Sequence, residues 1–150
     1  MTLCEGTWFA VPLRTSGFGV GVIARVAPAG GVLLCYFFGP KSAAVPSWGD
    51  VESLTPIDAV CVVRVGDLSL LQGEWPLIGR SASWNRLRWP VPAFVRSDEC
   101  SHKAWRVYYS DSDPNLVLRE ESVPYDTVSL DRDALLGSGA AERLLTKLLS

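Results

Sequence analysis

Two long runs of apolar residues lie close together in the first third of the chain. Residues 18–26 (FGVGVIARV) and 32–38 (VLLCYFF) are apolar, β-branched or aromatic, and residues 28–31 (PAGG) between them are typical of a turn. The pattern predicts a β-hairpin. Because apolar residues occupy successive positions, we expect both faces of the sheet to be covered, as at the centre of a closed or folded-over sheet.

Further strands are predicted on either side of this hairpin. Residues 7–13 are predicted to form a first strand and residues 59–65 (AVCVVRV) another. Residues 104–110 (AWRVYYS) alternate as a half-buried strand does, residues 111–115 (DSDPN) have the composition of a turn, and residues 116–121 (LVLREE) return. This last unit is the second predicted hairpin.

The end of the chain has a helical rather than a strand pattern. Apolar residues from Ala141 to Leu149 recur at spacings of three and four, and Glu142 and Lys147 suit the two ends of a helix dipole. We expect a cap at Ser138 or Gly139. Much earlier in the chain, between the predicted strands 32–38 and 59–65, the polar segment 41–56 is predicted to be a loop with at most one short helical turn. The predicted fold is α+β: a strongly bent, mostly antiparallel, barrel-like sheet with one C-terminal helix docked on it, in a single domain over residues 1–150.

Residues 65–96 combine tryptophan, proline and arginine. The segment holds Trp75, Trp84 and Trp89, with Pro76, Pro90 and Pro92, and with Arg80, Arg86, Arg88 and Arg96. Prolines remove backbone donors and favour extended geometry, while indoles bury large apolar surfaces. We expect an ordered loop held by its aromatic rings across an apolar surface, with guanidinium groups at the margin.

Composition narrows the class of protein. The chain is 48% hydrophobic and 20% charged with a net charge of −2, which argues against nonspecific phosphate binding. The first residues, MTLCEGTW, lack the basic and apolar regions of a signal peptide, and no apolar run is long enough for a membrane span. Four dispersed cysteines are then expected as reduced thiols in the cytoplasm.

The sequence offers little for catalysis, metal binding or a cofactor. There is no CxxC pair, and His102 is the only histidine, so no metal site or cofactor is predicted. Cys100 lies two residues from His102, but no neighbour orients the imidazole, and a solvated loop is the simpler interpretation. The glycine run 17–21 lacks the Lys-Ser/Thr of a phosphate loop.

Two segments carry candidate binding chemistry, each with a structural alternative. The acidic residues between 111 and 133 form either a solvated face or a partner-binding face. The aromatic and arginine residues of segment 65–96 suit a protein–protein hot spot, stacking of single-stranded nucleic acid, or simply a core with arginines over it.

Four phrases lie in order along the chain. They are residues 6–13 (GTWFAVPL), 70–80 (LLQGEWPLIGR), 89–94 (WPVPAF) and 136–145 (LGSGAAERLL). Together they resemble the immunity protein 26 family of bacterial polymorphic toxin systems. In that family the corresponding phrases are an opening "G..faiPL", a "dG.W..iG" followed by "P.P.F", and a closing "G.gavE..L" helix.

The resemblance implies a non-enzymatic immunity protein that binds a cognate toxin and neutralises it by stoichiometric occlusion in the cytoplasm. The alternative is a small nucleic-acid-binding barrel that uses the arginine and tryptophan loop. Because immunity proteins commonly meet basic toxin clefts, we expect the partner on the second hairpin, where Tyr108 faces away from Trp105. The predicted contact residues are Tyr108, Asp111, Asp113, Glu120 and Glu121. The alternative binding surface consists of Trp84, Arg86 and Arg88.

Overall fold

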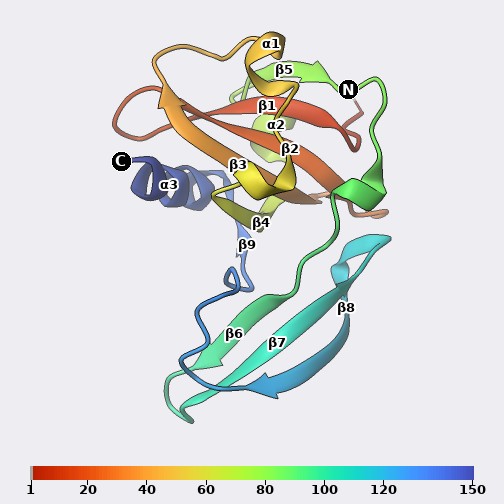
Figure 1. Ribbon diagram of the computed structural model, residues 1–150, viewed down its shortest axis with the longest axis vertical. Coiled ribbons are helices and arrows are strands. Elements are labelled where there is room, and N and C mark those ends of the chain that lie inside the picture. Colours follow the sequence, from red (N-terminus) through yellow and green to blue (C-terminus); the bar gives the residue numbers. More distant parts are fainter. Residues whose placement is uncertain (1) are drawn as a thin grey trace.

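Residues 2–150 are described by a computed structural model, in which the strands form two sheets (Figure 1). The larger sheet has the order β5-β1-β2-β3-β4-β9 and is antiparallel except for the parallel pair β4–β9. Its strands are β1 (Thr7–Pro12), β2 (Phe18–Val26), β3 (Val32–Ser42), β4 (Cys61–Gly66), β5 (Leu77–Arg80) and β9 (Leu135–Leu136). The smaller, antiparallel sheet consists of β6 (Phe94–Asp98), β7 (Lys103–Ser110) and β8 (Asp113–Val123).

Helices are few and mostly short. The C-terminal helix α3 (Ser138–Leu149) is capped by Gly137, one residue before the predicted cap. Two single turns, α1 (Trp48–Val51) and α2 (Leu68–Leu71), and two 3₁₀ turns, η1 (Pro56–Asp58) and η2 (Arg86–Arg88), lie in the connections. Among residues 2–150, no helix is long and apolar enough to span a membrane.

The predicted hairpin of β2 and β3 is confirmed and forms the centre of the larger sheet. Alternate residues of both strands enter two separate cores, one on each face. Ile23 and Cys35 lie in the first core, whereas Val22 and Tyr36 lie in the second. The expectation that both faces are covered is therefore correct.

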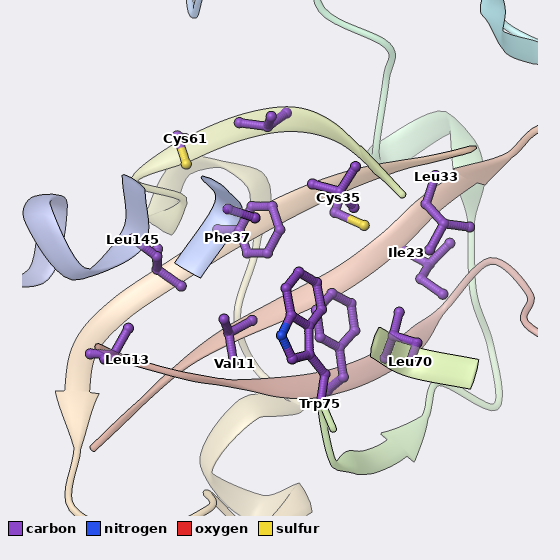
Figure 2. Close-up of a cluster of buried hydrophobic side chains, with 14 residues drawn as sticks. Val11, Leu13, Ile23, Leu33, Cys35, Phe37, Cys61, Leu70, Trp75 and Leu145 are labelled. Atoms are coloured by element: carbon purple, nitrogen blue, oxygen red, sulfur yellow. The ribbon is translucent and has the colours of Figure 1, made fainter. Parts of the chain in front are cut away.

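Helix α3 and Trp75 close the first face of the larger sheet (Figure 2). Trp75 lies between Leu70 of α2 and Leu145 of α3 in this view. The helix approaches β2 closely because Gly19 has no side chain: a Cβ there would lie 2.5 Å from Leu145 Cδ2. The glycine run 17–21 thus belongs to a packed strand.

The smaller sheet and Trp89 cover the second face. Phe94, Val107 and Tyr109 enter the same core as Trp8 and Tyr36. Figure 1 shows this sheet at the lower end of the molecule, with connecting chain running up to the larger sheet on two sides. Trp75 and Trp89 are both buried, as expected of rings that hold a loop across an apolar surface.

The prediction of a barrel-like sheet is wrong. Strands β5 and β9 lie at opposite edges of the larger sheet, and no closed barrel forms among residues 2–150. Both faces are protected by other elements, a helix on one and a second sheet on the other, so closure is not needed to bury them. The short strands β5 and β9 and the separation of β6 from the larger sheet were not predicted.

Candidate functional site

The two surfaces predicted for partner binding are adjacent and joined by an ion pair. Arg86 of η2 lies with Nη1 3.0 Å from Oδ2 of Asp111, which lies in the turn between β7 and β8. Arg86 Nη2 also donates to the main-chain oxygen of Asp111 at 2.9 Å. We call the alternative surface of Trp84, Arg86 and Arg88 the arginine loop. The arginine loop and the tip of the second hairpin therefore form one continuous surface.

Asp111 is tied to the protein core as well. Arg25 of β2, with only 2% of its side chain exposed, places Nη2 2.7 Å from Asp111 Oδ1. The hydrogen bond and charge of Arg25 hold the pKa of the Asp111 carboxyl below its ordinary value. A buried guanidinium without this carboxylate would be left uncompensated, so Asp111 first stabilises the contact between the two sheets.

Tyr108 and Glu121 lie together on one face of the smaller sheet. Tyr108 donates its hydroxyl to Glu121 Oε1 at 2.8 Å, and the guanidinium of Arg119 lies 3.9 Å from the tyrosine ring centroid. Arg106 lies 3.0 Å from the same carboxylate oxygen. These contacts lower the pKa of Glu121, through Tyr108 first and then the arginines. On this face two guanidinium groups therefore surround one carboxylate.

The remaining two acidic residues are separate from that group. Glu120 precedes Glu121 and points to the other face, because neighbouring residues on a strand alternate; it pairs with Arg96 at 2.6 Å. Asp113 accepts the main-chain N–H of Asn115 at 2.9 Å and has no ion-pair partner among residues 2–150. The five predicted contact residues thus lie on both faces of β7 and β8 and in the turn between these strands, and they do not form one acidic patch.

Trp84 of the alternative surface is partly used in packing. Its ring stacks on Trp89 with centroids 5.1 Å apart and planes 18° apart, and the backbone of Gly6 lies against it. Its indole Nε1 donates to Glu5 Oε1 at 3.3 Å. Stacking of nucleic-acid bases requires a free ring face. This geometry therefore disfavours the nucleic-acid alternative.

A cleft of about 380 Å³, which we call the tryptophan cleft, opens beside this stacked pair. Segments 52–56 and 81–89 form its walls, and Trp8 contributes to its lining. Its lining residues are Trp8, Glu52, Ser53, Leu54, Thr55, Pro56, Ser81, Ser83, Trp84, Asn85, Arg88 and Trp89. Two of its lining residues, Trp84 and Arg88, belong to the predicted alternative surface, whereas no sequence signal indicated the opposite wall, residues 52–56.

The only histidine of the sequence, His102, is not part of this cleft. His102 and Cys100 are exposed in the turn between β6 and β7, as expected of a solvated loop, and the His102 ring stacks on Tyr125 with centroids 3.8 Å apart. Among residues 2–150, no group of three His, Cys, Asp or Glu residues is placed to hold a metal ion.

The comparisons with known proteins identify the family. The family model of immunity protein 26 matches residues 4–106, well over half of the chain. The chain belongs to the immunity protein 26 family. No curated protein and no solved structure matches it. The matched residues include the opening and central phrases, while the closing phrase at 136–145 lies beyond them. Membership implies an immunity protein whose partner is a cognate toxin.

Proposed function

We propose that this protein neutralises its toxin by stoichiometric occlusion, as a binding partner without catalysis, in the cytoplasm. The observation that carries the proposal is the continuous surface formed by the second hairpin and the arginine loop. Arg86 and Asp111 join the two parts, and the buried Arg25 anchors Asp111 to the larger sheet. A rigid, pre-organised surface loses little conformational freedom when it binds.

The contact is centred on the second hairpin: Tyr108, Asp111, Asp113, Glu120 and Glu121. Strand β8 is an edge of its sheet, so a partner that approaches this edge reaches side chains on both faces. Exposed Leu116 and Leu118 in the same strand supply apolar surface between the charges. Apolar groups inside a charged rim are the usual anatomy of a protein–protein interface.

The test of occlusion is a titration of toxin activity. The probe is the purified cognate toxin domain, assayed against increasing amounts of the purified chain. Occlusion predicts that activity falls linearly and reaches zero at one equivalent. Complete inactivation by a small fraction of an equivalent would indicate catalysis and overturn the proposal.

Charge reversal tests the contact surface. Asp113→Lys and Glu120→Lys avoid Asp111, whose reversal would also disturb the buried Arg25. We expect both to weaken toxin binding, and the matched variant Arg143→Glu, on α3 at the opposite face of the larger sheet, to leave it unchanged. Equal affinity of all three variants with the wild type would place the contact elsewhere.

A further inference from the structure

We propose that the toxin interface extends from the second hairpin to the tryptophan cleft, which anchors it by receiving one toxin loop carrying an apolar or aromatic side chain beside a carboxylate. This inference rests on the proposed function and names the chemistry of the partner. A volume of about 380 Å³ is near the lower end of the range for ligand pockets, about 300–1,000 Å³. The cleft therefore suits one or two side chains rather than a helix.

The lining of the cleft combines fixed aromatic rings with polar groups. Trp89 stacks on Trp84 and meets Trp8 edge-on, with centroids 5.8 Å apart. Trp8 and Trp89 are buried, and Trp8 is fixed by its indole Nε1, which donates to Ser81 Oγ at 3.0 Å. A side chain that inserts here meets ring edges and polar groups already in place, and burial of a side chain in a pre-formed pocket is typical of a binding hot spot.

Two of the most exposed apolar side chains of residues 2–150 belong to residues next in sequence to wall residues of this cleft. Ile57, on η1 after the wall residue Pro56, is 91% exposed, and Leu87, on η2 before the wall residue Arg88, is 85% exposed. Both 3₁₀ turns are capped: Asp58 accepts the main-chain N–H of Thr55, and Asn85 accepts that of Leu87. Exposed apolar groups on such turns are available for contact with a partner that enters the cleft.

Charge determines which partner fits. Arg86 is already engaged by Glu5 and Asp111, whereas Arg88 lines the cleft, is exposed, and makes no side-chain hydrogen bond or ion pair in the part of the chain described. A free guanidinium at the edge of a pocket recognises a carboxylate through paired N–H donors. Glu52, on the opposite wall, is placed to accept a donor from the same loop.

The experiment measures affinity for the purified cognate toxin domain by isothermal titration calorimetry. The variants are Ile57→Ser, Leu87→Ser and Arg88→Glu. The matched control is Val128→Ser, because Val128 is also 91% exposed but lies outside the cleft. We expect each cleft variant to weaken binding about tenfold or more, and the control to stay within about twofold. Thermal unfolding should be unchanged in all four, since the altered side chains are exposed.

The outcomes separate this inference from the proposed function. If the cleft variants bind as the wild type does, the anchor is wrong while occlusion stands; if the wild type does not bind the toxin domain, occlusion itself fails. A wild type that sediments as a dimer, and becomes a monomer on Leu87→Ser, would assign the cleft to a second copy and overturn the proposal. A shift of the indole N–H resonances of Trp8 and Trp84 in the NMR spectrum when the toxin is added would support the proposal.

Discussion

The indole Nε1 of Trp75 donates a hydrogen bond of 2.8 Å to Glu142 Oε2, across 67 residues of chain. The same ring stacks on Phe9 with centroids 5.6 Å apart and planes 9° apart, and Glu142 pairs with Arg14 at 3.1 Å. The first strand, the central phrase and the closing helix therefore meet at one indole. A buried indole N–H needs an acceptor, and the Glu142 carboxylate in the second turn of α3 supplies it.

Replacement of Trp75 should separate packing from the hydrogen bond. Trp75→Ala should lower the free energy of unfolding by about 3–5 kcal/mol, since it empties a site at the centre of the first core. Trp75→Phe should cost less, because it keeps a ring against Phe9 and loses the N–H donor. Urea unfolding measures both. A loss below about 1 kcal/mol for Trp75→Ala would show that the ring is not a core element.

The Asp111 carboxylate should contribute to stability only while it is ionised. Arg25 lowers its pKa in the folded protein, so its contribution is fully present above the unfolded pKa of about 3.9 and disappears as the pH falls through the lower folded value. Asp111→Asn should be less stable than the wild type at pH 7, and the difference should close below about pH 4. A difference independent of pH would contradict the ion pair.

Asp131 should show the opposite sign. Its Oδ2 accepts the Val62 N–H of β4 at 2.9 Å, its main-chain oxygen accepts the Val95 N–H of β6 at 2.9 Å, and burial raises its pKa. A raised pKa favours folding below the unfolded value, and this advantage is lost as the pH rises. Asp131→Asn keeps the acceptor without the charge and should be at least as stable as the wild type at pH 7.

Asp131→Ala is the control for that variant. It leaves the Val62 N–H without its partner and should cost about 1–3 kcal/mol. Unfolding curves at pH 4 and pH 7 distinguish the two roles. Equal stability of the alanine and asparagine variants would mean that the hydrogen bond between Asp131 and the Val62 N–H of β4 contributes nothing to the free energy of unfolding.

Local pattern was enough to predict the central hairpin and the C-terminal helix. The apolar residues at successive positions of β2 and β3 require cover on both faces, and apolar residues at spacings of three and four from Ala141 to Leu149 predict a helix. Closure into a barrel does not follow from the same pattern, because a helix and a second sheet cover the two faces equally well. Strand β5, of four residues after Pro76, has too little periodicity to be recognised.

The contact residues on the second hairpin remain a prediction from residue type. Their ion-pair partners, Arg86, Arg96, Arg106 and Arg119, were not anticipated. Alternation along the strands offers part of that information, since Arg106 faces Glu121 directly across the β7–β8 pair. The pair of Arg25 with Asp111 depends on the packing of two sheets, and no periodicity along the chain contains it.

The cysteines should react in an order set by burial. Cys100 is exposed and Cys4 half-buried, whereas burial raises the pKa of Cys61 to about 12 and that of Cys35 further. Without reductant, a thiol reagent should modify Cys100 first and Cys4 more slowly, and should reach Cys35 and Cys61 only on unfolding. Denaturant should expose four thiols, as mass spectrometry of alkylated protein can show. Fewer than four would reveal a disulfide.

The family match ends at residue 106, yet the two cores extend beyond it, which leads us to predict that residues 1–106 do not fold alone. Such a fragment lacks Leu145 of the first core, Tyr109 of the second, and the partner of Trp75. It also leaves Arg25 without Asp111, and an unpaired buried charge is strongly destabilising. The full chain should unfold in one cooperative urea transition, whereas the fragment should show no transition and little amide dispersion in its NMR spectrum. A fragment that unfolded cooperatively would divide the chain into more than one domain.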